Sequence, residues 1–128
     1  DLSEGMLNRA RSKVPKAELK QGSFENLPYP DNAFDYVVST NAIGSVMVNP
    51  VRVVSEMLRV CRKGGEVMIA DYNFPPVISY KSKILTKFFG LAGDTPYDFA
   101  RIFRDIGYEP NVTIIGLYGM YQILKVKK

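Results

Sequence analysis

The fold is decided by Leu27-Pro28-Tyr29-Pro30-Asp31-Asn32-Ala33-Phe34-Asp35-Tyr36-Val37-Val38-Ser39-Thr40. In this stretch a proline-rich polar turn leads into a short apolar run with β-branched residues, and the run ends in small hydroxyl side chains. That order predicts a buried strand whose carboxyl end opens on a site. In open α/β sheets ligands bind at the carboxyl ends of strands, because helix N-termini and loops converge there. We expect Asp35, just inside the strand, to anchor neighbouring backbone amides in a structural role.

The composition of the 128 residues predicts one globular domain, since 46% are hydrophobic and 23% are charged. The net charge is +4, from 17 basic and 13 acidic residues. The basic residues do not form a stripe interleaved with aromatics, so we expect a solvated surface rather than a nucleic-acid interface. No apolar run approaches the roughly 20 residues that a membrane-spanning helix needs. The sequence therefore predicts no integral membrane segment.

The use of cysteine and histidine limits the chemistry. Cys61 is the single cysteine, so it cannot form an internal disulfide and indicates a reducing compartment, which we take to be the cytoplasm. The sequence contains no histidine, which excludes histidine triads, histidine–carboxylate acid–base pairs and histidine metal ligands. We predict no metal site.

The first part of the chain predicts a helix and a short strand. Ser3 is a good N-cap, and apolar residues recur on one face of a helix that Pro15 stops. A weak alternation then predicts a strand over residues 18–22. The inward face of the helix is predicted to hold Met6, Leu7 and Ala10.

The middle of the chain predicts a strand, a helix and a second strand. Residues 41–48 are expected to form a loop or a short helix, and Asn49-Pro50 has the cap-then-proline order that begins a helix. The glycines of Lys63-Gly64-Gly65 are expected to end that helix before a strand over residues 66–72. One βαβ unit indicates a parallel sheet. The inward face of the helix is predicted to hold Val54, Met57, Leu58 and Cys61, which makes Cys61 a core residue rather than a nucleophile.

The last part predicts two helices and a hairpin. One helix covers residues 79–91, and another begins at Thr95-Pro96 and stops at Gly107. Two β-rich runs, over residues 111–118 and 120–126, are separated by a single glycine. This spacing predicts an antiparallel hairpin.

Three segments of the chain carry a resemblance to a known family. They are Asp1-Leu2-Ser3-Glu4-Gly5-Met6-Leu7, Gly22-Ser23-Phe24-Glu25-Asn26-Leu27-Pro28-Tyr29-Pro30-Asp31-Asn32-Ala33-Phe34-Asp35 and Glu56-Met57-Leu58-Arg59-Val60-Cys61-Arg62-Lys63-Gly64-Gly65. In order and spacing they resemble the class I S-adenosylmethionine-dependent methyltransferases, and are most similar to the ubiquinone/menaquinone-type branch that acts on small molecules. The resemblance implies a Rossmann-like α/β sheet, mostly parallel with an antiparallel C-terminal hairpin strand. It also implies that residues 1–128 are a single partial domain whose first two strands are missing from this chain.

The same resemblance implies a site for S-adenosyl-L-methionine. In such folds an acidic residue at the end of the second strand accepts hydrogen bonds from both ribose hydroxyls, and the next residue packs against adenine. Asp1 and Leu2 stand at these two places. The end of the third strand commonly carries an Asp for the adenine amino group, followed by a residue whose backbone N–H meets the ring. Ser23 and Phe24 stand there, and Ser23 departs from the pattern because it carries no charge. Thr40 borders the methionine part of the cofactor.

Two departures from the family bear on catalysis. The glycine-rich loop after the first strand is absent from this chain, and Asn41-Ala42-Ile43-Gly44-Ser45-Val46 stands where many relatives carry a histidine-containing segment. We therefore assign no catalytic residue. Methyl transfer from a sulfonium needs an aligned nucleophile about 3 Å from the methyl group more than it needs an acid or base, so a site without histidine can work. The candidates for orienting a substrate are Asn41, Asp71, Tyr72 and Asn73, for each of which loop capping or surface polarity is the simpler interpretation.

The predicted function is S-adenosylmethionine-dependent methyl transfer to a small-molecule acceptor, with this chain as the C-terminal part of the catalytic domain and inactive alone. Two alternatives stay open. One is a nucleotide-binding dehydrogenase fragment, because that fold also places an acidic residue on a ribose. The other is a non-catalytic, methyltransferase-like structural or interaction domain. The segment over residues 80–89 allows a substrate lid or a membrane-surface helix, although a plain core helix is the simplest interpretation.

The family's strand order predicts an open edge. Two strands absent from this chain separate the predicted strand near Leu19 from the strand that contains Val37 and Val38. We expect a gap there, with upstream residues outside this chain. The alternatives are a partner chain that fills the gap and a direct pairing of residues 18–22 with residues 35–39. An open edge invites pairing with another chain, so it also allows an oligomer.

Overall fold

The structure is a computed structural model that describes residues 1–44, 48–75, 77–91, 93 and 96–128. Its elements along the chain are α1 (Glu4–Lys13), β1 (Phe34–Thr40), α2 (Pro50–Val60), β2 (Cys61–Tyr72), α3 (Tyr80–Leu91), α4 (Phe99–Asp105), β3 (Asn111–Gly116), a short 3-10 turn (Leu117–Gly119) and β4 (Tyr121–Lys127). This order confirms the α/β class.

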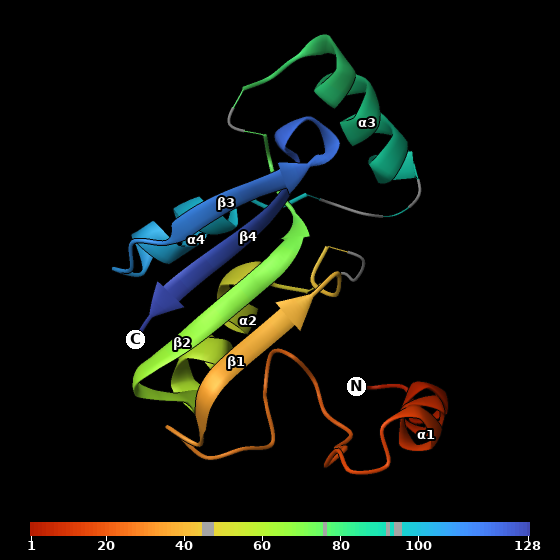
Figure 1. Ribbon diagram of the computed structural model, residues 1–128, viewed down its shortest axis with the longest axis vertical. Helices are drawn as coiled ribbons and strands as arrows, with labels where there is room; N and C mark the ends of the chain where they lie inside the picture. Colours follow the sequence, from red (N-terminus) through yellow and green to blue (C-terminus); the bar gives the residue numbers. More distant parts are fainter. Residues whose placement is uncertain (45–47, 76, 92, 94–95) are drawn as a thin grey trace.

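One sheet organises these elements, with its strands in the order β1-β2-β4-β3 (Figure 1). β1 pairs with β2 in parallel, and Val37 lies opposite Val67. β4 is antiparallel to both of its neighbours, so Leu124 lies opposite Ile69 on β2 and opposite Val112 on β3. The predicted parallel unit and the predicted antiparallel C-terminal hairpin are both confirmed.

The core lies between the sheet and the helices α2 and α4, which cover the same face of it (Figure 1). α2 begins as its sequence predicts, because the Asn49 side chain accepts hydrogen bonds from the amides of Val51 and Arg52 and Pro50 takes the first turn. Its apolar side then packs on the strands, as expected for an amphipathic helix. The fully buried side chains of this core include Val54, Cys61, Val67, Ile69, Phe99, Phe103 and Leu124.

The end of α2 differs from the prediction. The helix stops at Val60, and Cys61 is already extended at φ −71° and ψ 135° because it pairs with Phe34 in the sheet. Pairing with a neighbouring strand thus ends the helix before the glycines are reached. Gly64 has a φ of +77° in the irregular first part of β2. Gly65 is needed for close approach, since a Cβ there would lie 2.6 Å from the Asp35 carbonyl oxygen.

The predicted strand over residues 18–22 does not form. In the part of the chain that the structure describes, this segment has no strand beside it, and a single bridge joins Ser23 to Asn26 just after it. No ladder joins residues 18–22 to residues 35–39 within the described chain, because the pairing of β1 is with β2. The outer edge of β1 is therefore open among the described residues. The alternative of a sheet closed by direct pairing of these two segments is therefore wrong.

β1 is not the buried strand that its apolar run predicts. Tyr36 is 72% exposed and Val38 is 55% exposed, because both point away from α2 and α4 and the strand has one neighbour instead of two. The role expected for Asp35 is also wrong. Its carboxylate forms an exposed ion pair with the Arg62 guanidinium on β2 rather than anchoring backbone amides.

The remaining helices follow their predicted positions. Ser3 caps α1 by accepting a hydrogen bond from the Met6 amide, but of the predicted inward face only Leu7 is fully buried. α3 and α4 form within the predicted ranges, and α4 is capped by the Asp98 side chain. Thr95, the predicted start of α4, lies outside the described residues.

Candidate functional site

A cavity of about 320 Å³ lies where three separate segments of the chain meet. The first is the N-terminal segment with α1, the second is the turn after residue 21, and the third is the loop that follows β1. The cavity is mainly apolar with a few polar groups at its wall, which is typical of a small-molecule site. Its lining residues are Asp1, Leu2, Met6, Gly22, Ser23, Phe24, Asn41, Ala42 and Val48.

Backbone hydrogen bonds hold the first segment against the second. The Asp1 nitrogen donates to the Lys20 carbonyl at 3.3 Å, and the Gly22 amide donates to the Asp1 carbonyl at 3.1 Å. The Gln21 side-chain amide adds a bond to the Leu2 carbonyl at 3.0 Å. These bonds place the side chains of Asp1 and Leu2 next to the turn that carries Ser23.

The Asp1 carboxylate is fixed by the start of α1. Its Oδ1 accepts a hydrogen bond from the Ser3 amide at 2.8 Å, and Ser3 in turn caps the helix. Because the first turn of a helix carries partial positive charge, a carboxylate is stabilised there. Leu2 beside it is 68% exposed and so leaves an apolar surface open to a ligand.

The second wall is a tight turn at residues 22–26. The Asn26 amide donates to the Ser23 carbonyl at 3.2 Å, and the Glu25 amide donates to Ser23 Oγ at 3.2 Å. Gly22 is required by close packing, since a Cβ there would lie 2.9 Å from Cδ of Pro28. Phe24 packs on the main core and also lines the cavity, so the core holds one wall of the site in position.

The third wall is held by a buried carboxylate. Asp71, at the end of β2 and 1% exposed, accepts hydrogen bonds through Oδ2 from the amides of Ala42 and Ile43, at 3.2 and 3.0 Å. Its Oδ1 accepts from the Tyr72 amide at 2.8 Å. A carboxylate that receives several backbone amides is a strong, directional anchor. Asp71 thus positions the loop that brings Asn41 and Ala42 to the cavity.

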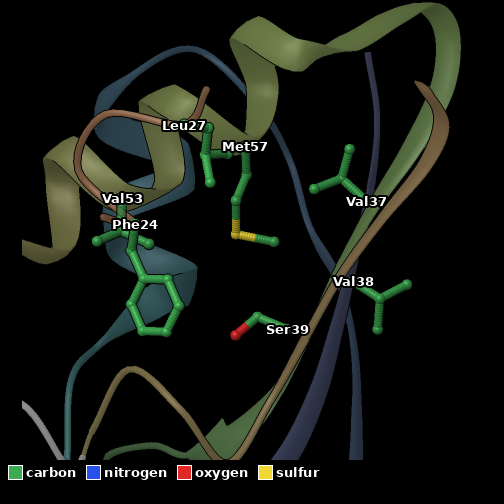
Figure 2. A pocket seen from close by; sticks show the side chains of 7 residues that line it. All are labelled: Phe24, Leu27, Val37, Val38, Ser39, Val53 and Met57. Carbon is green, nitrogen blue, oxygen red and sulfur yellow. The ribbon is translucent and has the colours of Figure 1, made fainter. Parts of the chain in front are cut away.

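A second hollow, of about 160 Å³, lies beside the open edge of β1. Figure 2 shows Phe24, Leu27, Val53 and Met57 along one side of it, with Val37 and Ser39 of β1 on the other. Val38 points to the opposite side of the strand (Figure 2). The Ser39 hydroxyl is the single polar side-chain group in this lining. Phe24 lines both hollows.

The turn before β1 is fastened to α2 by an ion-pair cluster. The Arg59 guanidinium binds Glu56 and Asp31, each at 2.8 Å, and donates to the carbonyls of Leu27 and Tyr29. Glu56 also accepts from the Leu27 amide at 2.8 Å. Hydrogen bonding to the Arg59 guanidinium lowers the pKa of the Glu56 carboxyl below its ordinary value, and the same carboxylates raise the pKa of Arg59. Glu56 and Arg59 therefore form a charged pair at neutral pH.

The structure brings five of the predicted site residues to one cavity. These are Asp1, Leu2, Ser23, Phe24 and Asn41. Thr40 ends β1 one residue before Asn41, but it is exposed and is not among the described residues that line the cavity.

The predicted site residues at the end of β2 do not line this cavity. Tyr72 stacks against Phe89 of α3, with ring centroids 4.5 Å apart, and Asn73 is 2% exposed with its side-chain amide donating to the Asp71 carbonyl at 2.8 Å. Among the described residues, no donor reaches Asn73 Oδ1. Asp71 is committed to backbone amides, so its carboxylate is an anchor rather than a group that meets a substrate.

Sequence reasoning missed four lining residues, which are Met6, Gly22, Ala42 and Val48. Met6 was assigned to the buried face of α1, yet it is half exposed and faces the cavity. Its position in the sequence could have indicated this role, because Met6 lies in the first turn of α1, directly after Asp1 and Leu2. Cys61 is fully buried as predicted, and burial raises the pKa of its thiol, which opposes a role as nucleophile.

The described residues provide neither a metal-binding cluster nor a membrane-spanning helix. Within the described residues, no three His, Cys, Asp or Glu side chains gather closely enough to hold a metal ion. The described helices include none that is long and apolar enough to cross a membrane.

Comparisons with known proteins identify the family. A methyltransferase domain model matches residues 1–69. The chain is 50% identical over 78 residues to a phosphatidylethanolamine N-methyltransferase of Cereibacter sphaeroides, an alignment that covers 56% of this chain and 38% of that protein. It is 36% identical over 77 residues to a demethylmenaquinone methyltransferase of Paenarthrobacter aurescens, covering 60% and 30% respectively. The chain thus spans about a third of the length of the curated relatives it matches.

A solved structure supports the same assignment at the level of fold. It is a S-adenosylmethionine-dependent methyltransferase of Thermotoga maritima, described as a possible histamine N-methyltransferase, with a TM-score of 0.73 at 20% identity. The match covers all of this chain and 72% of that one. These findings decide against the dehydrogenase alternative. The chain therefore belongs to the methyltransferase domain family, and its fold is that of part of a class I S-adenosylmethionine-dependent methyltransferase domain.

Proposed function

We propose that the protein containing this chain transfers a methyl group from S-adenosylmethionine to a small acceptor of lipid character. The single observation that carries the proposal is the meeting of Asp1, Leu2, Ser23 and Phe24 at one cavity. These residues come from two segments that lie about 20 residues apart in the sequence, and backbone hydrogen bonds hold them together. The family match over residues 1–69 includes both segments.

The residues at this cavity fit the nucleoside part of the cofactor. Asp1 offers a carboxylate in which Oδ1 is already positioned by the Ser3 amide, and a carboxylate of that kind accepts hydrogen bonds from the two hydroxyls of a ribose. Leu2 and Phe24 offer apolar surfaces from opposite segments for a flat aromatic base. Ser23 adds a hydroxyl, which can accept a hydrogen bond from an amino group. We assign the cofactor to Asp1, Leu2, Ser23 and Phe24, with Thr40 at the exit of β1 nearest its methionine end.

The chemistry requires little from the side chains. S-adenosylmethionine supplies a methyl group on a good leaving group, so orientation of the acceptor accounts for most of the work. Asp71 contributes by holding the loop after β1 at a fixed position relative to β2. Asn41 on that loop, with Tyr72 and Asn73 at the neighbouring strand end, is assigned to the acceptor side.

The acceptor class is inferred from the relatives. One relative is named for phosphatidylethanolamine and another for demethylmenaquinone, and both acceptors are small groups attached to long hydrocarbon chains. The shared chemistry is an amine or ring carbon that is presented from a lipid phase. We propose that this protein acts on such an acceptor from the cytoplasm, without nucleic acid as a partner, and that the open edge of β1 is its route to any oligomer.

Label transfer tests the proposal. The full-length protein is incubated with S-adenosylmethionine labelled in its methyl group and either detergent-dispersed phosphatidylethanolamine or a demethylated quinone. We expect label in the organic extract with one of the two acceptors, and much less label there with an Asp1→Ala variant at limiting cofactor. Binding of the cofactor with label in neither extract would instead support the non-catalytic alternative.

A further inference from the structure

α3 is attached to the rest of the molecule by one narrow side. Its buried and half-buried residues are Ser82, Leu85, Thr86 and Phe89. The Phe89 ring lies 4.5 Å from that of Tyr72, and Thr86 Oγ1 contacts Met120 Sδ at 3.9 Å. The spacing of these four residues is that of a single helix face. α3 therefore rests on the carboxyl end of β2 and leaves its opposite side to solvent.

The solvent side of α3 is apolar. Tyr80, Ile84, Phe88 and Leu91 are each between 53% and 82% exposed. At 100° per residue these four positions fall within about 80° of the helix circumference, so they form one continuous stripe. Surface helices of globular proteins usually show the reverse arrangement, with polar residues outward. The segment before the helix continues the pattern, since Phe74, Val77 and Ile78 are also exposed.

Lysines border this stripe on both sides. Lys81, Lys83 and Lys87 are all exposed, and on a helical projection Lys81 falls on one flank while the other two fall on the opposite flank. The Lys81 ammonium lies 5.2 Å from the centre of the Tyr118 ring, which is itself exposed. The sequence contains no Asp or Glu from residue 72 to residue 93. The solvent face of α3 is thus apolar along its centre and cationic along its borders.

We propose that this face of α3 binds an anionic lipid surface, with the helix lying in the plane of the interface. An apolar stripe flanked by lysines is the arrangement that lets hydrocarbon side chains enter the acyl boundary while ammonium groups stay among anionic headgroups. A protein partner for an apolar stripe does not require a border of uncompensated positive charge, whereas an anionic bilayer does. A twelve-residue helix is also too short to cross the membrane, which agrees with a location at its surface.

The position of α3 relates binding of the lipid surface to the site at the strand ends. The helix lies beyond the edge of the sheet at which β1 and β2 end (Figure 1), the edge that carries Asn41 and Tyr72. Docking of α3 places this edge against the bilayer, so a lipid acceptor reaches the site without leaving the membrane. The inference rests on the proposed lipid acceptor for its purpose, but the binding of α3 to the surface is measured without any methyl transfer.

Vesicle co-sedimentation of the full-length protein tests the proposal. The two probes are vesicles of phosphatidylcholine alone and vesicles in which phosphatidylglycerol replaces part of it. We expect binding to the anionic vesicles that weakens with added salt. Replacing all three lysines, in K81Q/K83Q/K87Q, should lower the partition constant about 100-fold, since each lysine near an anionic surface contributes about 1 kcal/mol, or about fivefold. The matched control K13Q/K16Q/K63Q removes three exposed lysines outside α3 and should leave the partition constant unchanged.

A second variant tests the apolar stripe. I84S/F88S keeps every charge and should reduce binding at least tenfold while leaving the thermal unfolding midpoint unchanged, because both side chains are already in water. Equal loss in the control triple, unchanged binding in both α3 variants, or no binding of the wild type to anionic vesicles would each overturn the proposal. A second copy of the chain, or another segment of the protein, could instead pack on this face of α3. In that case I84S/F88S would change the oligomeric state or the stability, and the wild type would not bind vesicles. Transfer of label to a detergent-dispersed acceptor is measured in parallel, so failure of the proposed function is distinguished from failure of vesicle binding.

Discussion

β1 and β2 are neighbouring parallel strands with similar apolar runs, yet they lie in different surroundings. Val37 on β1 pairs with Val67 on β2, and the next pair is Val38 with Met68. The first pair points to the core face of the sheet and the second pair to the opposite face. β2 has β1 on one side and β4 on the other, and Val67 is completely buried while Met68 is half-buried. β1 has a neighbour on one side among the described residues, and the partners on it are more exposed, since Val37 is half-buried and Val38 is more than half exposed. The difference teaches that the neighbours of a strand, more than its own sequence, decide how far it is buried.

The two strands also differ in how they serve the site. β2 contributes the fixed element, because Asp71 at its end is buried and holds the loop after β1. β1 has an open edge beside the smaller hollow, and Phe24 lines both that hollow and the cavity at Asp1. Rows of unpaired backbone groups at such an edge favour the addition of another strand. We expect substitutions on β2 to be costly in this chain and substitutions on β1 to be tolerated.

The largest expected effect is in the centre of the sheet. Ile69→Ala should lower the free energy of unfolding by about 2–5 kcal/mol, because it leaves a cavity in a packed core. Val38→Ala on β1 should cost less than about 1 kcal/mol, since the side chain is already in water. Urea unfolding of this chain measures both. Equal costs for the two substitutions would show that the Val38 side chain is covered in solution.

The next largest effect concerns the anchor at the end of β2. Asp71→Ala leaves the amides of Ala42 and Ile43 without their acceptor and should cost about 1.5–3 kcal/mol of stability. Asp71→Asn keeps one acceptor oxygen and should cost less. In the full-length protein Asp71→Ala should also weaken binding of the acceptor more than binding of the cofactor, because the loop it holds carries Asn41. A uniform loss of both affinities would instead indicate general unfolding.

A smaller effect is expected where the turn before β1 meets α2. Glu56→Gln should lower stability by about 1 kcal/mol at neutral pH, because it weakens the bonds to Arg59 and to the Leu27 amide. The pKa of Glu56 is lowered in the folded state, mainly by its hydrogen bond to Arg59. Its contribution is therefore present above the unfolded pKa of about 4.3 and is lost as the pH falls through the folded value.

Unfolding curves of wild type and Glu56→Gln over a pH series measure this contribution. The difference in stability between the two proteins should be full at pH 7 and should shrink below about pH 4. A difference that stays constant down to the lowest pH would mean that the Glu56 charge has no part in holding the turn.

The sequence predicts the parts of this fold that depend on local patterns. The Asn49-Pro50 start of α2, the burial of its apolar face and of Cys61 just after it, and the hairpin of β3 and β4 all follow from spacing and capping. The strand expected over residues 18–22 and the burial expected for β1 both fail for one reason, since each needs neighbouring strands that the described chain does not contain. The end of α2 fails because pairing of Cys61 with Phe34 overrides the glycine signal.

The site, too, combines features that could be predicted from the sequence with features that depend on long-range contacts. Asp1, Leu2, Ser23 and Phe24 were identified from the family resemblance, and the structure places them at one cavity although nothing local in the sequence links residue 1 to residue 23. The anchoring of the loop by Asp71 could not be predicted, because it joins residues 28 and 29 positions apart through the sheet. Long-range contacts of this kind depend on register, which composition and periodicity do not determine.

Calorimetric titration of the full-length protein with S-adenosylmethionine tests the central claim, which is that the cavity at Asp1 binds the cofactor. The informative variant is Asp1→Asn, because the amide oxygen still accepts from the Ser3 amide while the charge offered to the ribose is removed. The account predicts a dissociation constant about tenfold higher, or about 1.4 kcal/mol, for Asp1→Asn. It predicts no change for the control Asp105→Asn, whose carboxylate lies on the exposed side of α4. An unchanged dissociation constant in Asp1→Asn would contradict the assignment of this cavity to the cofactor.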